Sequence, residues 1–250
     1  DWRQRRDQGA RPRVRRPAPG GRRREHHTRG NSTGDNKLKL LFVRHAETTA
    51  NAEGRFQGHA DYSLSARGQA QAQLLQTRFL LEELVPTHLY SSPLKRCAET
   101  AEIISSSWPT VQYWEDLQEH DVGVLSGLTW DEAIARFPQI DRELEESRQF
   151  AGVEGAESLQ DRRDRGQRVA DGLLSRHAED DVVVAVSHGG ILQHILSGLL
   201  GANRVWGVSI QNTAVFEFDL DVGRWSMDGE ARLTSAQNRI VRFNDAAHLV

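Results

Sequence analysis

The segment LKLLFVRHAETTAN, residues 38–51, changes from apolar to polar and charged side chains at Arg44. Residues 38–43 are typical of a short buried strand. Arg44 and His45 follow directly, so two basic groups stand where the first core strand ends. Either the strand has simply reached the surface, or the two groups face a ligand, because open α/β sheets bind ligands at the carboxyl ends of their strands.

A second strand is followed by a similar polar sequence. Residues 182–187, VVVAVS, form an apolar run that is typical of a central parallel strand buried on both faces. His188, Gly189 and Gly190 come next. If the two strands are neighbours, His45 and His188 project into one crevice. The glycines then let the backbone approach a ligand, and the following helix offers amide N–H groups to an anion.

Strand and helix patterns alternate along the rest of the chain. Further strands are expected at 87–90 and 111–114, and a final hairpin at 213–219 and 224–227. Helices are expected at 66–84, 93–105, 130–137, 157–178 and 189–200, the second with Ser92 as N-cap and Pro93 in its first turn. This alternation predicts an α/β fold with three α/β/α layers and a doubly wound, mostly parallel sheet.

The composition divides the 250-residue chain into two parts. Residues 1–30 hold eleven arginines against three acidic residues, about +8, so the remainder carries about −11 of the net −3. We expect a disordered Arg/Pro-rich tail at 1–36 and a folded domain at 37–250. Such a tail fits nucleic-acid binding, a transit peptide or a translated upstream remnant, and these alternatives stay open. The folded domain itself is not expected to bind nucleic acid.

Cysteine content and hydropathy bear on location. With the single cysteine Cys97, no disulfide can form within the chain, which favours a reducing, cytoplasmic location. No apolar run approaches the roughly 20 residues of a membrane span, so no membrane association is expected. The sequence leaves the oligomeric state open, including a homodimer.

Two further residues fit a phosphate site at the strand ends. Arg96 stands in the first turn of a predicted helix and, with Arg44, would present guanidinium groups that match phosphate oxygens. Glu119 follows another predicted strand and is a candidate acid for the leaving oxygen. Burial in an enclosed site would raise the pKa of this carboxyl.

Each of these residues alone also has an ordinary structural explanation. A strand-end histidine, a solvated Arg96 on a helix or a loop Glu119 is common. Metal binding is a weaker alternative for the histidines, because no HExxH motif occurs and His188 and His194 lie six residues apart. Cys97 beside Arg96 is interpreted as a buried helix residue rather than a reactive thiolate.

Taken together, the motifs resemble those of the histidine phosphatase superfamily, the phosphoglycerate mutase-like proteins. The resemblance extends from Leu38 onward. Its motifs are RHAET at 44–48 with Asn51, GRFQG at 54–58, DYSLSARGQA at 61–70, SSPLKRCAET at 91–100, LQE at 117–119 with Gly127, GAES at 155–158 and SHGG at 187–190.

The resemblance implies a role for each matching residue. His45 would be the nucleophile that forms a phosphohistidine, and Glu119 would protonate the leaving alcohol and then activate water. The remaining site residues would bind the phosphoryl group or orient the site: Arg44, Asn51, Gln57, Gly58, Arg96, His188 and Gly189. The resemblance implies no metal and no cofactor.

Two departures from the family pattern guide the choice of activity. Ala46 replaces a common glycine, which is tolerable at negative φ or where there is room for a methyl group. Val122 stands where cofactor-dependent mutases usually have tyrosine, and residues 119 to 188 lack their longer basic insertion. The sequence therefore favours a metal-independent phosphomonoester phosphatase acting on a small phosphorylated metabolite. The alternatives are a 2,3-bisphosphoglycerate-dependent mutase and a non-catalytic relative that binds a phosphorylated ligand.

Overall fold

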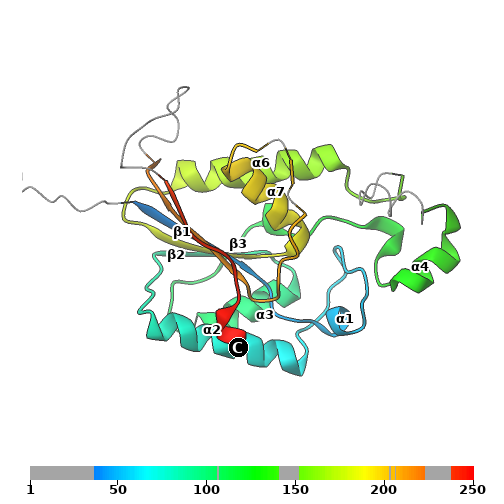
Figure 1. Ribbon diagram of the computed structural model, residues 1–250, viewed down its shortest axis with the longest axis horizontal. Helices are drawn as coiled ribbons and strands as arrows, with labels where there is room; N and C mark the ends of the chain where they lie inside the picture. Colours follow the sequence, from blue (N-terminus) through cyan, green and yellow to red (C-terminus); the bar gives the residue numbers. More distant parts are fainter. Residues whose placement is uncertain (1–36, 106, 141–151, 203, 206, 223–237) are drawn as a thin grey trace, which may run out of the picture. The chain divides into compact units, whose positions relative to one another are not determined.

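A six-stranded sheet forms the centre of the folded unit in a computed structural model (Figure 1). The structure describes residues 37–250 except 106, 141–151, 203, 206 and 223–237. The expected tail at 1–36 and the expected strand at 224–227 lie outside the described residues. The strands, in sheet order, are β3 (Gln112–Tyr113), β2 (His88–Ser91), β4 (Val182–Ser187), β1 (Leu38–Arg44), β5 (Val215–Leu220) and β6 (Arg239–Asp245).

The sheet is parallel through its first four strands. β3, β2, β4 and β1 pair in parallel, whereas β5 runs antiparallel to β1 and β6 antiparallel to β5. The predicted mostly parallel sheet is therefore confirmed. β5 thus has two antiparallel neighbours, β1 and β6, and β6 is a strand that the sequence pattern did not predict.

Helices cover both faces of the sheet (Figure 1). Helices α6 and α7 lie on one face, and α2 and α3 lie on the other. The helices are α1 (Thr49–Ala52), α2 (Ala66–Leu81), α3 (Lys95–Ile104), α4 (Trp130–Arg136), α6 (Leu159–Arg176) and α7 (Gly189–Leu199), with short 3₁₀ turns η1 (Glu115–Leu117), η2 (Gly123–Leu125) and η3 (Ala247–Leu249). None of these described helices combines the length and apolar character needed to cross a membrane.

Helix α3 begins later than expected. Its N-cap is Leu94 in an extended conformation and its first residue is Lys95, so the predicted start at Pro93 is wrong. The Ser92 hydroxyl accepts from the Leu94 N–H at 3.3 Å, which closes a tight turn before the helix. Ser92 is thereby held in the loop that follows β2, where it faces the candidate site.

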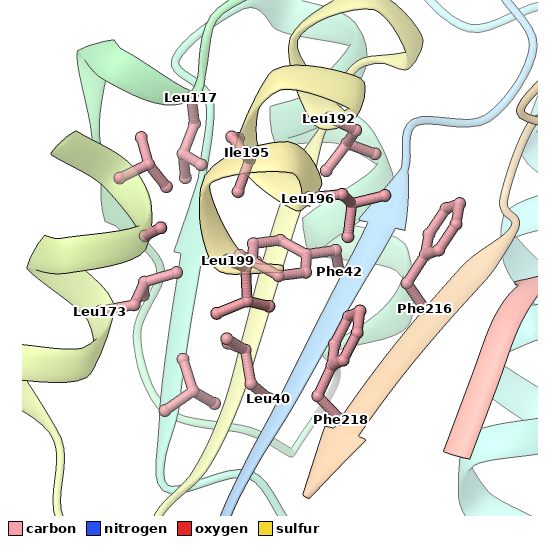
Figure 2. Close-up of a cluster of buried hydrophobic side chains, with 14 of the residues drawn as sticks. Leu40, Phe42, Leu117, Leu173, Leu192, Ile195, Leu196, Leu199, Phe216 and Phe218 are labelled. Atoms are coloured by element: carbon pink, nitrogen blue, oxygen red, sulfur yellow. The ribbon is translucent and has the colours of Figure 1, made fainter. Parts of the chain in front are cut away.

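The alternation of side chains along β1 builds two apolar layers. Leu38, Leu40 and Phe42 pack into the cluster beneath α6 and α7, whereas Leu41 and Val43 pack toward α2 and α3. Figure 2 shows the first cluster, in which Phe42 lies among leucines of α7 and phenylalanines of β5. Full burial of one such side chain stabilises the fold by about 1.5–3 kcal/mol. A strand buried on both faces explains the apolar run at residues 40–43.

The register of the central strands places their carboxyl ends level. β1 and β4 are direct neighbours, and Arg44 pairs with Ser187. The His45 N–H donates to the Ser187 carbonyl at 2.9 Å, so the pairing continues one residue past the end of the strand. The residues that follow both strands, His45 and His188, are thus brought side by side.

Candidate active site

The two strand-end histidines meet in a buried pocket. Their ring centroids lie 5.1 Å apart, and His45 and His188 are 3% and 0% exposed. Burial, together with the nearby positive charges of Arg44 and Arg96, lowers the pKa of His45 well below its usual value. Burial and Arg96 do the same for the pKa of His188. Both imidazoles are therefore neutral at pH 7.

The contacts of His45 fix which of its nitrogens can react. Nδ1 lies 2.7 Å from the Ala46 carbonyl oxygen, an atom that can only accept, so Nδ1 carries the proton and donates it. The unprotonated lone pair is then on Nε2. The backbone carbonyl of His45 accepts from Asn212 Nδ2 at 3.0 Å, which holds the loop. The geometry gives His45 one tautomer, with its free lone pair on Nε2.

Arg96 is fixed by three acceptors inside the protein. Nε donates to His188 Nδ1 at 3.0 Å, and the two terminal nitrogens donate to the carbonyls of Ala60 at 2.9 Å and Gly58 at 2.8 Å. A guanidinium has five N–H groups, so two remain to bind phosphate. His188 Nε2 lies 2.8 Å from the Ser92 hydroxyl. His188 therefore orients Arg96, with both ring nitrogens already engaged.

Arg44 offers a donor that the protein leaves unpaired. One terminal nitrogen donates to the Ile210 carbonyl, but the buried Nε has no hydrogen-bond partner among the described residues. A Cβ at Gly189 would lie 3.3 Å from this Nε, so glycine keeps the space beside it open. A buried unpaired N–H is costly, and an anion bound here would satisfy it. This atom is the clearest sign of a phosphate site.

Glu119 binds the N-terminus of α7. Its carboxylate accepts from the backbone N–H groups of Gly190 at 2.9 Å and Ile191 at 2.8 Å. It also accepts from the His120 N–H at 3.0 Å, and His120 Nδ1 lies 3.0 Å away. A Cβ at Gly190 would approach Glu119 Oε1 to 2.5 Å, so only glycine permits this docking. The helix amides that the sequence assigned to a phosphate are used by the protein's own carboxylate.

The protonation of Glu119 differs from the expectation. Burial acts to raise the pKa of this carboxyl, but His120, His188 and the Gly190 amide together hold the pKa well below its usual value. The expected raised pKa is therefore wrong, because the helix amides and the imidazoles stabilise the charged form more than burial destabilises it. At neutral pH the side chain is a carboxylate.

The other predicted binding residues mainly support the site. The Asn51 amide oxygen accepts from the Thr48 N–H at 3.1 Å and so caps α1, and the Thr48 hydroxyl lies 3.0 Å from Gln57 Oε1. Gly58 has φ +51° and contributes its carbonyl to Arg96. Ala46 lies outside the left-handed region and is fully buried, so its methyl group is accommodated as the sequence required.

Several contributors had no signal in the sequence. Ser92 contacts His188, the Ala60 carbonyl holds Arg96, and His120 contacts Glu119. A serine before a helix is an expected cap, which concealed its role beside His188. Cys97 is fully buried, and burial raises the pKa of its thiol, which confirms the interpretation of an unreactive residue.

A cavity of about 280 Å³ lies next to the segment that holds Glu119. Gln118 and Asp121, which flank Glu119, both line it, and His59 Nε2 is 2.8 Å from the Glu119 carbonyl. The residues that line it are His59, Glu115, Asp116, Gln118, Asp121, Glu157 and Arg165. Two of its carboxylates are paired with arginines, Glu157 with Arg165 and Asp116 with Arg168.

Comparison with known proteins agrees with this geometry. Over 193 residues the chain is 33% identical to "phosphoglycerate mutase-like protein 4" and to "metal-independent phosphoserine phosphatase", both of Arabidopsis thaliana. Each alignment covers 76% of this chain and 83% or 79% of the relative. The solved structure of Bacillus stearothermophilus YhfR has the same fold, with a TM-score of 0.70 at 24% identity, over 85% of this chain and all of that one.

The family model of the histidine phosphatase superfamily (branch 1) matches residues 40–231. This range includes both strand-end histidines, both arginines and Glu119. The chain belongs to the histidine phosphatase superfamily, branch 1.

Proposed function

We propose that this protein is a metal-independent phosphomonoester phosphatase that acts on a small phosphorylated metabolite through a phosphohistidine. One observation carries the proposal: His45 presents an unprotonated Nε2 in the pocket that also holds Arg96 and the unpaired Nε of Arg44. A neutral imidazole next to two fixed cations is suited to attack phosphorus, since the cations stabilise charge on the phosphoryl oxygens.

In the first step, His45 Nε2 attacks phosphorus and the bond to the ester oxygen breaks. The leaving alcohol takes a proton from Glu119, and the phosphoryl group stays bound to His45. Arg44 Nε and the two remaining N–H groups of Arg96 hold the phosphoryl oxygens. Arg96 does not have to move, because Gly58, Ala60 and His188 already hold its plane.

In the second step, a water oxygen attacks phosphorus, Glu119 accepts the water proton, and the bond to Nε2 breaks. Inorganic phosphate and neutral His45 are formed. The ionised state of Glu119 suits this base role directly. For the first step Glu119 must gain a proton, and a phosphate dianion bound nearby favours this, because a neighbouring negative charge raises a carboxyl pKa.

The sequence favours hydrolysis over mutase activity. Val122 stands where cofactor-dependent mutases usually have tyrosine, and residues 119–188 lack their longer basic insertion. A cytoplasmic location fits the single free Cys97.

The test supplies p-nitrophenyl phosphate, phosphoserine and 3-phosphoglycerate in the presence of EDTA. We expect at least one of these substrates to release inorganic phosphate, and to do so at the same rate with and without EDTA. A parallel assay supplies 3-phosphoglycerate with 2,3-bisphosphoglycerate. Rapid interconversion of the monophosphoglycerates with little phosphate release would replace the phosphatase with a mutase, and inactivity throughout would favour a binding protein.

A further inference from the structure

A second cluster of chemically reactive side chains lies at the opposite end of the central strands. His88 is the first residue of β2, and Asp181 directly precedes β4. His177 is the C-cap of α6. One ligand atom from each of the three residues lies within 4.8 Å of the others. We propose that His88, His177 and Asp181 bind a divalent transition-metal ion such as Zn²⁺.

The separations of the ligand atoms suit a tetrahedral ion. His88 Nδ1 is 3.7 Å from Asp181 Oδ1, and His177 Nδ1 is 3.6 Å from Asp181 Oδ2. Ligands about 2.0–2.2 Å from a tetrahedral zinc are separated by roughly 3.3–3.6 Å. These two contacts involve different oxygens of Asp181, and one ligand atom from each of the three side chains lies within 4.8 Å of the others. The side chains would therefore draw together by up to about 1 Å around the ion, and water would supply the fourth ligand.

His177 gives an independent reason to expect a ligand. Its side chain is 2% exposed, and its Nδ1 has no hydrogen-bond partner in the part of the chain that the structure describes. The other ring nitrogen, Nε2, lies 3.2 Å from the Tyr90 hydroxyl. If Nε2 carries the proton and donates it to the Tyr90 hydroxyl, the lone pair of Nδ1 points toward Asp181. This is the usual arrangement of a metal-binding histidine, whose second nitrogen is held by a protein acceptor.

The carboxylate is also held in place. Asp181 Oδ2 accepts from the Ala178 N–H at 2.9 Å, and Oδ1 accepts from the Thr87 hydroxyl at 3.1 Å. The ring centroids of His88 and His177 lie 4.4 Å apart, with the edge of one ring toward the other. His88 Nδ1 also contacts the Thr87 hydroxyl at 2.9 Å, so metal binding through this nitrogen would replace one hydrogen bond. Two imidazoles and one carboxylate favour zinc or cobalt over magnesium or calcium.

The proposed metal site is separate from the phosphate pocket. β4 runs between them, and its six residues span roughly 20 Å at about 3.3 Å per residue. The ion would tie the amino ends of β2 and β4 to the end of α6. Its expected effect is on stability, and catalysis should continue without it.

The full chain, stripped of metal with EDTA and dialysed, is titrated with Zn²⁺ by calorimetry and with Co²⁺ by visible absorption. We expect His88→Ala and Asp181→Asn each to bind one equivalent less Zn²⁺ than the wild type and to lose the Co²⁺ bands of a tetrahedral site. His59→Ala, which removes a histidine far from the cluster, should keep both. Zn²⁺ should raise the Tm of the wild type by several degrees and leave that of the two cluster variants unchanged.

Unchanged stoichiometry and spectra in both cluster variants would overturn the proposal, as would a wild type that binds no Zn²⁺ at micromolar concentrations. Asp181→Asn keeps the size of the side chain and one acceptor oxygen, so it remains informative if His88→Ala folds poorly. Turnover of p-nitrophenyl phosphate is measured beside each titration. Loss of turnover in the wild type after EDTA treatment would contradict the separation of the two sites.

Discussion

Arg96 Nε donates a hydrogen bond to His188 Nδ1 at 3.0 Å and thereby joins helix α3 to the end of β4. An arginine can only donate, so Nδ1 must be unprotonated and Nε2 must carry the hydrogen. That hydrogen is directed to the Ser92 hydroxyl, 2.8 Å away. The pair fixes one tautomer of a neutral histidine and one orientation of the guanidinium plane, and both are set before a substrate binds.

Substitution of His45 by alanine should lower turnover by at least about 10³-fold, because the lone pair of the neighbouring His188 Nδ1 already accepts from Arg96 and cannot replace His45 Nε2. Brief reaction with labelled phosphoserine and an alkaline quench should trap an acid-labile label on His45 of the wild type. His88→Ala, at the end of β2 opposite the pocket, serves as the matched control and should keep the label. Near-normal turnover in His45→Ala would remove this residue from the chemistry.

Substitution of Glu119 by glutamine should slow hydrolysis of alkyl phosphates by roughly 10²–10⁴-fold, the usual range for lost acid–base catalysis. Formation of phosphohistidine from p-nitrophenyl phosphate should be less affected, because its leaving group needs little protonation. Rapid-quench measurement of phosphohistidine formation compares an alkyl phosphate with p-nitrophenyl phosphate in this step. Glu102→Gln, which replaces an exposed carboxyl of α3, is the control. Equal losses on both substrates in this step would assign Glu119 a purely structural role.

Substitution of Gly190 by alanine tests the docking of Glu119 on α7. The new Cβ would lie 2.5 Å from Glu119 Oε1 and 2.3 Å from His120 Nδ1, so both side chains must shift. We expect a fall in kcat on alkyl phosphates without global unfolding, since alanine is favoured over glycine within a helix by about 1 kcal/mol. Gly198→Ala, in the same helix, should leave kcat unchanged. Equal kcat in the two variants would argue against this docking.

Stability should fall as the pH is lowered from 7 to 5. The pKa values of His45 and His188 lie well below 6.5 in the folded chain, so the unfolded chain takes up more protons once the pH drops below about 6.5. Each such histidine contributes up to about 1.4 kcal/mol per pH unit until its folded pKa is reached. Urea unfolding at several pH values measures the slope. Burial also lowers the pKa of His194, to about 4, and His194→Gln should give a shallower slope.

Removal of residues 1–36 should leave kcat/KM and Tm unchanged. The residues of the pocket and of the proposed metal site all lie after Lys37, and β1 begins at Leu38. Calorimetric melting and steady-state kinetics of a chain that starts at Lys37 provide the comparison. A fall of several degrees in Tm would mean that residues 1–36 stabilise the folded domain.

The strand ends were predictable because they depend on local patterns. Apolar runs at 38–43 and 182–187 indicated the central strands, and the edge rule for parallel sheets then placed His45 and His188 together. The docking of Glu119 was not predictable, since it joins residues 71 and 72 positions apart through backbone N–H groups, which any residue type except proline carries. The same holds for the Gly58 and Ala60 carbonyls that hold Arg96. Strand β6 was missed because Arg239–Asp245 is a largely exposed edge strand without a clear apolar alternation.

The hydrogen bond from His45 Nδ1 to the neighbouring carbonyl also has a stereochemical consequence. It holds the imidazole in one orientation, so in the proposed mechanism His45 attacks phosphorus from one side and the alcohol departs on the other. Water then enters through the space that the alcohol vacated. Each displacement inverts the arrangement of oxygens around phosphorus, and two inversions cancel. A thiophosphate ester made chiral with two oxygen isotopes, hydrolysed in water that carries the third, should therefore yield chiral thiophosphate with net retention of configuration.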